Sequence, residues 1–485
     1  MPAYHSTELT KFASFSSLLE FIDKRREEPG SFESFEQELG RRMRTLESDL
    51  TAAQLARYDV EAQVIWVDGQ EWRRCLEKEP KRYLGASGPI TVERNLFRPS
   101  GGGKSLCALD LRAGIVGGLC TPLLTRRVCY VMGHMTSAET ADLFREFEIE
   151  GPSSSSCDRI PKVVSLAWER HREVWESALR QQETVPVEAT VMAVSLDGVM
   201  VPDKDAQRVA KSKREERKKD LSKATGGPAG YREVGCGTVS LFDTEGQRLD
   251  TVRYGRAPER KKKTLTEQLD AEVASILAVT SVALVALADG AEENWRYFSG
   301  SLWEQATKIV DFGHACEHLK AGLTAYYGAK GTEGRAEYER LKVIFKDQSG
   351  GVDEVIAALL RLERKLREKK RKKHGELVRK ERKYFENQRG RMDYARYQEL
   401  GLPIGSGVVE AACKTLATQR MKRSGMSWAD GKQPILTIRS LQQSGRWDRA
   451  WRLIAGEFQN TPFVVGNRGG LKILRQPDYA VAQAG

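Results

Sequence analysis

The sequence lacks cysteine pairs, long apolar segments and an acidic excess, and each absence excludes a class of protein. Its eight cysteines include no C-x-x-C pair, which argues against a disulfide scaffold or a zinc ribbon and suits a reducing compartment. The longest uncharged apolar run, VASILAVTSVALVALA, has 16 residues (273–288), whereas a membrane-spanning helix needs about 20. We expect this run to form a helix end, a turn and a buried strand. The first residues, MPAYHSTELTKF, show no secretory signal, so we expect a cytoplasmic protein that spans no membrane.

The composition instead describes a folded, basic protein. The chain has 485 residues, for which we expect about two to four domains. With 40% hydrophobic and 8% aromatic residues, it can build cores. Its 78 Lys and Arg against 67 Asp and Glu give a net charge of +11 and a pI near 9.1. This excess favours a polyanionic partner, nucleic acid before membrane.

The first 185 residues divide into two regions. Residues 1–110 combine helical spacing before residue 60 with a β-hairpin pattern after it. Residues 111–185 are helical, and a Gly-Pro-Ser turn at residues 151–153 separates two expected helices. The second helix would begin within residues 153–156, whose serines offer N-caps. The spacing fits a DNA-binding helix-turn-helix, with the second helix in a major groove, and it fits an ordinary helical hairpin equally well.

Residues 186–312 predict the first part of an α/β domain. Three strand patterns come first, then a helix, then two more strands. Antiparallel-type strands followed by alternating helix and strand give the order of a ribonuclease-H-like, or retroviral-integrase-like, fold. We expect residues 313–400 to form a basic helical insertion in this core. Residues 401–430 would supply its last helix, and residues 431–485 a helical extension.

Three carboxylates occur in distinct settings within this predicted core. Asp197 and Asp289 each end a buried strand, and Glu410 lies in the first turns of a helix entered through Gly-Ser-Gly. Adjacent strand ends and one helix can bring three acidic groups together, as hard divalent ions such as Mg²⁺ require. Two such ions activate the attacking oxygen and stabilise the leaving one in phosphodiester cleavage. The alternative is that both Asp-Gly pairs are ordinary turns and that Glu410 favours the helix dipole.

The helix expected after this carboxylate would extend the site toward a phosphate backbone. Glu410, Lys414, Ala417 and Met421 fall on one face at helical spacing, so Lys414 would lie one turn from the carboxylate. Further positive charge follows at Arg420, Lys422 and Arg423. The alternative for this face is a solvated surface with ion pairs along the helix.

Two other basic segments fit a nucleic-acid contact and a plain solvated surface about equally. Residues 361–383 contain 13 Lys or Arg and 4 Asp or Glu. Along a DNA backbone, each phosphate neutralised by such residues would release counterions. Residues 211–219 contain six basic and two acidic residues and follow the first strand of the predicted core, where they could clamp a substrate or form a disordered insertion.

Two motifs point to other chemistries. Gly103-Lys104-Ser105 resembles the end of a phosphate-binding loop, but Arg98 stands where the first glycine belongs and no apolar strand precedes it. The segment from His314 to His318, HACEH, fits the H-x-x-E-H zinc-peptidase signature. Both histidines would share a helix face, with Glu317 as general base. The sequence offers no identifiable third ligand, and a peptidase leaves the positive charge unexplained.

Four blocks, SLDGVMV, ALADGAEENW, DFGHACEHL and GLPIGSGVVEAACKTLATQRMKRSGMSW, resemble the DDE-type transposases of bacterial insertion sequences. The similarity is closest to the ISKra group, which is related to the Mutator-like transposases, and it covers roughly residues 186–428. It implies that Asp197, Asp289 and Glu410 bind catalytic Mg²⁺ or Mn²⁺ ions. The Asp-x-x-His element of the family matches Asp311 and His314, which would lie beside the active site.

The resemblance implies an enzyme that cuts transposon ends by metal-dependent hydrolysis and joins them to target DNA. A homodimer or higher oligomer would bind both DNA partners in the cytoplasm, at the nucleoid. His314 would position a phosphate or flanking base, while Lys414 and Arg420 would hold the strand. Many relatives carry a Cys-paired zinc ribbon near the N terminus. Here only Cys75 and Cys107 lie in that region, so we expect no zinc there.

Other classes of function remain open from the sequence. One is a DNA-binding protein without catalysis, and another is a structure-specific nuclease with the same ribonuclease-H-like fold. A zinc peptidase that uses the HACEH segment is the third.

Overall fold

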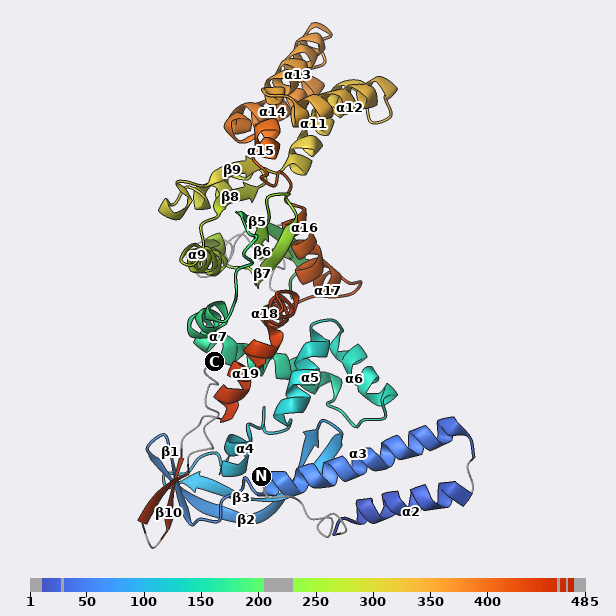
Figure 1. Cartoon of the computed structure of the whole chain (residues 1–485), viewed down its shortest axis with the longest axis vertical. Helices are drawn as coiled ribbons and strands as arrows, with labels where there is room; N and C mark the ends of the chain where they lie inside the picture. Colours follow the sequence, from blue (N-terminus) through green and yellow to red (C-terminus); the bar gives the residue numbers. More distant parts are fainter. Residues whose placement is uncertain (1–10, 28–29, 205–229, 460–462, 468–469, 475–485) are drawn as a thin grey trace. The chain divides into compact units, whose positions relative to one another are not determined.

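The structure is a computed structural model that describes residues 11–27, 30–204, 230–459, 463–467 and 470–474. The basic run 211–219 lies outside these residues. The described chain forms two compact units (Figure 1), here called the terminal unit (residues 1–175 and 447–485) and the central unit (residues 176–446). None of the described helices is long and apolar enough to cross a membrane.

The terminal unit contains a six-stranded sheet in the order β11-β10-β1-β2-β3-β4. Its strands are β1 (Val64–Val67), β2 (Gln70–Gly85), β3 (Gly88–Pro99), β4 (Leu106–Cys107), β10 (Phe463–Asn467) and β11 (Gly470–Leu474). The expectation of a wholly helical C-terminal extension is therefore wrong. β10 pairs antiparallel with β1, which satisfies the backbone groups that β1 would otherwise expose at an edge.

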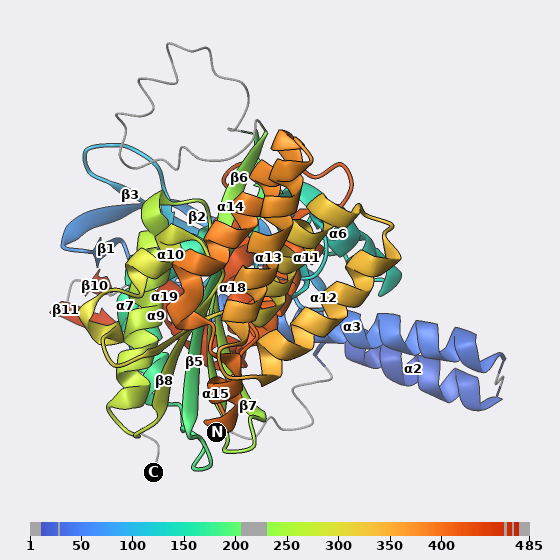
Figure 2. The same cartoon turned by 90° about the horizontal axis from the view of Figure 1, so that it is seen from above.

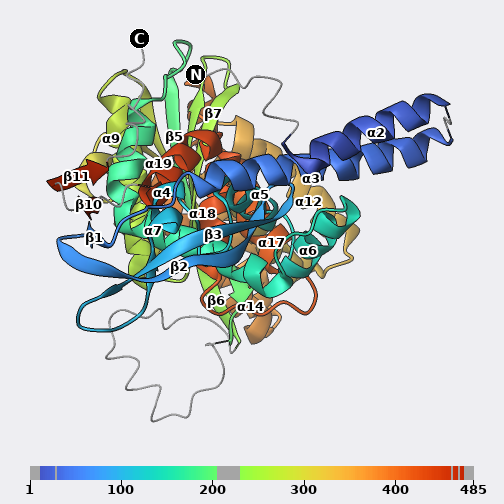
Figure 3. The same ribbon diagram turned by 90° about the horizontal axis from the view of Figure 1, so that it is seen from below.

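A helical hairpin precedes this sheet, as the spacing before residue 60 predicted. Figure 3 shows α2 (Ala13–Glu27) and α3 (Phe32–Ala56) side by side. The stacked rings of Phe21 and Phe35, with centroids 5.6 Å apart, join the two helices. Leu55, near the end of α3, is buried in one cluster with Tyr83 and Ile90 of the sheet.

Four helices follow the first strands: α4 (Ala108–Ala113), α5 (Pro122–Met132), α6 (Ser137–Glu146) and α7 (Ser154–Gln181). The predicted turn between α6 and α7 is confirmed. Gly151 allows this turn to approach α6 closely, because a Cβ there would lie 2.5 Å from the ring of Phe144. Ser153 caps α7 by accepting the Ser156 N–H at 3.3 Å. The two helices keep both interpretations of residues 111–185 open.

The central unit is built on a five-stranded mixed sheet in the order β7-β6-β5-β8-β9. Its strands are β5 (Val191–Pro202), β6 (Tyr231–Phe242), β7 (Arg248–Arg256), β8 (Ala283–Ala288) and β9 (Thr307–Val310). β5, β6 and β7 pair antiparallel, whereas β5, β8 and β9 pair parallel. This mixed α/β arrangement confirms the predicted class and is compatible with a ribonuclease-H-like fold. The apolar run 273–288 forms a helix end, a turn and the buried strand β8, as expected.

Alternating residues of β6 face two different layers. Gly237 faces α9 (Lys263–Leu277), where a Cβ would lie 2.9 Å from Leu269, so only glycine permits this close approach. The preceding residue, Cys236, is buried on the other face of the sheet, in one hydrophobic cluster with Leu416. This period of two is what an extended strand between two layers requires.

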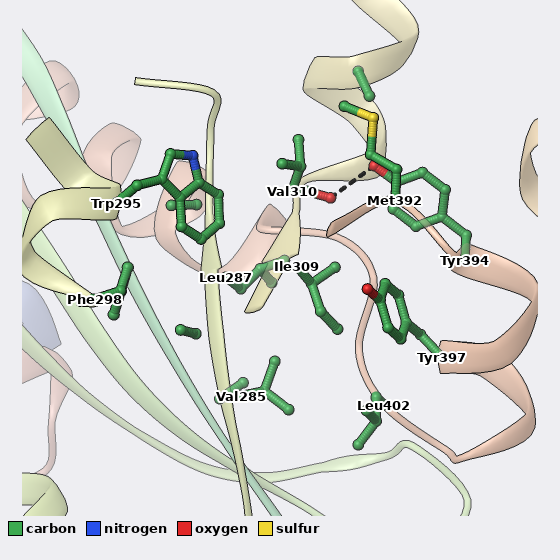
Figure 4. Packing of buried hydrophobic residues seen from close by; sticks show 14 of the residues in the cluster. Val285, Leu287, Trp295, Phe298, Ile309, Val310, Met392, Tyr394, Tyr397 and Leu402 are labelled. Carbon is green, nitrogen blue, oxygen red and sulfur yellow. Dashed lines mark hydrogen bonds between the residues drawn. The ribbon is translucent and has the colours of Figure 1, made fainter. Parts of the chain in front are cut away.

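The core of the central unit continues from the sheet into the helices beyond β9. The short elements around it are η2 (Arg260–Lys262), α10 (Glu292–Tyr297) and η3 (Ser301–Trp303). Figure 4 shows Val310 beside Tyr394, whose buried hydroxyl donates a 2.8 Å hydrogen bond to the Val310 carbonyl. Ile309 and Leu402 belong to the same cluster.

Helices occupy the segment for which the insertion was predicted. It contains α11 (Phe312–Tyr327), α12 (Thr332–Asp347), α13 (Gly351–Glu368), α14 (Lys372–Gln388), η4 (Arg389–Arg391) and α15 (Tyr394–Glu399). Figure 2 shows α11 to α14 as neighbouring helices, and α14 packs against both α11 and α13. The two ends of the insertion meet at its base, where the Phe312 N–H donates to the Ile404 carbonyl at 2.9 Å.

The chain after the insertion is less regular than predicted. One amphipathic helix was expected from residue 408 to 423. The structure instead has α16 (Gly407–Ala412), a π-helical turn η5 (Cys413–Thr418) and α17 (Gln419–Met421). α18 (Lys432–Gln443) then packs on β7, and α19 (Trp447–Gln459) belongs to the terminal unit.

Candidate active site

Three aspartates lie at one level across the parallel strands of the central unit. The register pairs Ser195 of β5 with Leu287 of β8, so two residues further on Asp197 is level with Asp289. In the same way β8 and β9 pair through Ala288 and Val310, which places Asp311 level with Asp289. Neighbouring strands lie about 4.8 Å apart, and residues at one level of a parallel pair share a face. The parallel pairing therefore places the three aspartates at the same level along β5, β8 and β9.

Asp197 does not end its strand, contrary to expectation. β5 continues to Pro202 because β6 pairs with it along its whole length, whereas the parallel pairing with β8 ends at Ser195. The Asp197 carboxylate accepts the Gly198 N–H at 2.6 Å and lies 3.4 Å from the Cys413 thiol, which donates to it. The side chain is half-buried. The bond from Cys413 connects Asp197 to the π-helical turn that follows α16, the helix of Glu410.

Asp289 is held by the helix that follows it. Its Oδ1 accepts the Ala291 N–H at 3.0 Å and the Asn294 side-chain amide at 2.8 Å. The same amide group lies 3.4 Å from the Leu196 carbonyl. Asn294 is 3% exposed and thus ties the end of β8 to β5 next to Asp197. The sequence analysis overlooked this residue, although it stands within the ALADGAEENW block.

Asp311 is the least exposed of the three, at 2%. It is the N-cap of α11, and its Oδ1 accepts the His314 N–H at 2.5 Å. Its Oδ2 accepts the Ser406 N–H from the segment that leads into α16. A single buried carboxylate therefore joins the start of the insertion to its end. The sequence placed Asp311 beside the active site but did not reveal this connection.

Glu410 lies on α16 within reach of the aspartates. Its Oε1 is 3.4 Å from the Ser406 hydroxyl, which donates to it. Partial burial raises the pKa of Glu410, and the charges of Asp311 and Asp197 raise it further, against a lowering by Ser406. The charges of Asp311 and Asp197 thus both act on Glu410, while Asp289 follows β8, the strand between β5 and β9. We call Asp197, Asp289, Asp311 and Glu410 the carboxylate cluster.

The cluster has the donor chemistry of a hard divalent cation site. No lysine or arginine of the described chain forms an ion pair with Asp197, Asp289, Asp311 or Glu410, so their negative charge is uncompensated. Carboxylate oxygens are the ligands that Mg²⁺ prefers. Across the described residues, however, no group of three or more His, Cys, Asp or Glu side chains is already arranged around a single ion position. The residue types therefore fit such an ion, but the described side chains do not already surround one position for it.

A buried thiol pair lies behind Asp197. Cys236 is its direct cross-strand partner on β6, and Cys413 lies on the π-helical turn. The contact with Cys236, burial and the nearby Asp197 all raise the pKa of the Cys413 thiol. Cys413 is consequently a neutral hydrogen-bond donor to Asp197 and not a metal-binding thiolate.

The four residues expected on one helix face are divided by the π-helical turn. Glu410 and Lys414 are exposed, whereas Ala417 and Met421 are fully buried. A π-helical turn contains an extra residue, which rotates every later position away from its α-helical place. Lys414 retains its expected position one turn after Glu410, and the shared face ends there.

Two of the three cations after the helix face solvent. Lys422 and Arg423 are exposed, as a DNA contact requires. Arg420 was expected to hold the strand as well, but it is 3% exposed and its guanidinium lies over the Trp428 ring, 5.1 Å from the centroid. This burial against Trp428 corrects the expectation that Arg420 contacts a DNA strand.

The two histidines of the HACEH segment share a face of α11, with ring centroids 5.8 Å apart. His314 is partly exposed, and its Nδ1 lies 3.8 Å from the Glu317 carboxylate. The Nδ1 of His318 instead lies 2.6 Å from Glu381 of α14. Its ring also stacks on Tyr384 at 3.7 Å. Thus only His314 is open toward a bound molecule, while His318 connects two helices.

The insertion contacts the turn after Asp289 directly. The Gln388 side chain donates to the Gly290 carbonyl at 3.3 Å. The ring of Tyr384 covers Gly290, where a Cβ would lie 2.1 Å from it. Burial, followed by the charges of Asp289 and Asp311, raises the pKa of Tyr384 well above its usual range. No sequence signal related the far end of α14 to this turn, because 98 residues separate Gln388 from Gly290.

Comparison with known proteins gives only distant structural similarity. No protein-family model matches the chain, and no curated protein sequence matches it. Among solved structures, the chain is similar to the "Drosophila P element transposase strand transfer complex", with a TM-score of 0.25 and 9% sequence identity. The alignment covers 73% of this chain and 85% of that chain. Similarity at this level fixes neither the fold nor the activity of this chain.

Proposed function

We propose that this protein is a DDE-type DNA transposase with a ribonuclease-H-like core, related to the ISKra group of bacterial insertion sequences. The observation that carries the proposal is the placement of Asp197 and Asp289 level with each other on adjacent parallel strands, with the charge of Asp197 acting on Glu410. The sequence resemblance selects the same three residues. The net charge of +11 supports a polyanionic substrate.

The reaction would be hydrolysis at the transposon ends and then attack of the freed 3′-hydroxyl on target DNA. A pair of Mg²⁺ or Mn²⁺ ions bound by Asp197, Asp289 and Glu410 would activate the attacking oxygen and stabilise the leaving one. The protein itself supplies orientation. Asn294 fixes Asp289 and the Cys413 thiol fixes Asp197, so both carboxylates are held before substrate arrives.

Substrate contacts would come from the exposed groups around the cluster. His314 would position a phosphate or a flanking base, and Lys414, Lys422 and Arg423 would contact the strand. We also propose that helices α6 and α7 act as a DNA-binding helix-turn-helix. Two transposon ends must be brought together, so a homodimer or larger oligomer would be the acting form, at the nucleoid.

The experiment is a strand-transfer assay on labelled DNA from the ends that flank the gene. Wild-type protein with Mg²⁺ should give nicked and joined products, and both EDTA and Asp197→Asn should abolish them. Asp197→Asn should bind the same DNA with nearly unchanged affinity, because the substitution alters one acceptor at the metal site and no cation. Near-wild-type cleavage by that variant would refute the site. Cleavage of junctions or flaps without joining would identify a nuclease, and binding without cleavage would identify a DNA-binding protein.

A further inference from the structure

The turn between α13 and α14 is the most concentrated positive surface in the described chain. Eight of the ten residues 364–373 are Lys or Arg, and only one is acidic. All eight are exposed. They are Arg364, Lys365, Arg367, Lys369, Lys370, Arg371, Lys372 and Lys373. We call this surface the basic tip.

The cations of the basic tip have no acidic partners in the described structure. None of the eight takes part in an ion pair there, although cations nearby in the same insertion do. Arg340 of α12 pairs with Glu337, and Arg382 of α14 pairs with both Glu363 and Glu386. An ordinary solvated helix surface intersperses both signs of charge in this way. The basic tip departs from that pattern and repels itself unless an anion covers it.

The basic tip is an ordered turn and not a loose tail. Leu366 within it is 1% exposed, and the Arg371 N–H donates to the Leu366 carbonyl at 2.9 Å. The Lys370 N–H donates to the Arg367 carbonyl at 3.0 Å. Together these two bonds form a Schellman motif, which ends α13. Its left-handed position, with a φ of 54°, is occupied by Lys370, where glycine is the usual and less strained residue. The turn therefore keeps a cation at a conformational cost.

One continuous helix connects the basic tip to the carboxylate cluster. α14 begins at Lys372 and ends at Gln388, which contacts Gly290 beside Asp289. At 1.5 Å per residue, the 16 steps of this helix span about 24 Å. Duplex DNA advances about 3.4 Å per base pair, so this length corresponds to about seven base pairs. Lys380 and Lys383, both exposed, lie along the way.

We infer that the basic tip binds the phosphate backbone of duplex DNA about seven base pairs from the bond that is cut at the carboxylate cluster. This inference rests on the proposed function. α14 acts as a rigid spacer between the two contacts, because its Gln388 end is fixed at Gly290 and its Lys372 end at the Schellman turn. The contact is to phosphates and therefore independent of base sequence.

The test compares a tip variant with a matched control in the full-length protein. The tip variant carries Arg367→Gln, Lys370→Gly and Arg371→Gln. These substitutions remove three charges and keep the backbone hydrogen bonds of the turn. The glycine also removes the backbone strain of a lysine in the left-handed conformation. The control carries Lys330→Gln, Arg335→Gln and Lys346→Gln, which removes three charges from α12 and the loop before it. Each is also combined with Asp197→Asn, so that binding is measured without cleavage.

Two measurements decide the matter. In the tip variant, the slope of log affinity against log salt concentration should become less steep by about three, because each lost phosphate contact contributes about 0.9. In the control, the slope should change by less than one. Ethylation interference should disappear about seven base pairs from the cut and persist at the cut. An unchanged slope, or interference lost only at the cut, would overturn the inference while leaving the proposed function intact. If the wild type binds DNA but does not cut it, the proposed function fails, and the slopes alone still decide whether the tip binds DNA.

Discussion

The substitution Asp311→Asn tests whether the carboxylate cluster depends on its most buried member. The two oxygens of Asp311 accept the N–H groups of His314 and Ser406, and the side chain is 2% exposed. An asparagine keeps one acceptor oxygen, but its amide nitrogen then faces the second N–H group. Hydrogen bonds to a charged group contribute about 1.5–3 kcal/mol each. Loss of one of them should lower the free energy of unfolding by about 2–3 kcal/mol.

A second effect has the opposite sign. Removal of the Asp311 charge relieves its repulsion of Glu410, whose pKa that charge helps to raise. Glu410 is exposed, however, so solvent around it screens this repulsion to about 1 kcal/mol or less. The buried hydrogen bond outweighs this gain, so the variant should be less stable by about 2 kcal/mol.

Urea unfolding at neutral pH measures this difference, and hydrogen exchange of the α11 and α16 amides locates it in the central unit. Asp353→Asn is the matched control, because Asp353 is an exposed aspartate of the same unit that pairs with Arg389. The control should change the free energy of unfolding by less than about 0.5 kcal/mol. If Asp311→Asn were as stable as the control, the bond between Asp311 and Ser406 would not hold the insertion closed.

Three further outcomes follow from buried or crowded groups. Arg446→Met removes the partner of Glu272, which is 2% exposed, and should cost about 3–5 kcal/mol in urea unfolding, with part of it recovered in the double variant with Glu272→Gln. Gly290→Ala places a methyl group against the Tyr384 ring and should lower the free energy of unfolding by about 1–3 kcal/mol. Adding Tyr384→Leu to this variant should recover most of that loss, whereas additive losses would contradict the contact. Because partial burial, followed by the charge of Asp311, raises the pKa of Glu410 above its usual 4.5, its ionised form destabilises the metal-free protein at neutral pH. Glu410→Gln should therefore raise the thermal midpoint at pH 7, and this gain should vanish as the pH falls below about 4.5, whereas a constant gain would refute the repulsion.

The sequence predicted that Asp197 and Asp289 follow buried apolar residues of strands, because each depends on a local pattern, but it did not predict that β5 continues beyond Asp197. A buried apolar run followed by Asp-Gly predicted Asp289 after a strand, and the alternation of strand and helix patterns predicted the mixed α/β class of the domain around it. The same local logic failed for the helix after Glu410. A π-helical turn inserts one residue into the helical period, and no residue type in Cys413–Thr418 announces it. Arg420, which lies beyond this turn, was expected to hold a DNA strand and is instead buried.

The other surprises are contacts between distant segments. β10 completes the sheet at β1 although about 400 residues separate them, and Tyr384 covers Gly290 from the far end of the insertion. Neither partner carries a signal of its own, since an exposed strand edge and a glycine after a strand are compatible with many neighbours. Periodicity identifies the elements, whereas pairing between them is decided by the complementarity of surfaces that only the folded chain brings together.

The insertion itself shows how a long segment can stand between two residues of one site. Closing a loop of this length costs little more entropy than closing a shorter one, and the bonds from Phe312 to Ile404 and from Ser406 to Asp311 close it at the base. If those two hydrogen bonds were its only connection to the sheet, the packing within the insertion would not affect the position of Glu410. Yet Phe345 and Tyr394 of the insertion lie in the same buried cluster as Ile309 of the sheet, so the core is continuous across the boundary. Glu410 therefore owes its position to the packing of the whole insertion as well as to the two bonds that close its ends.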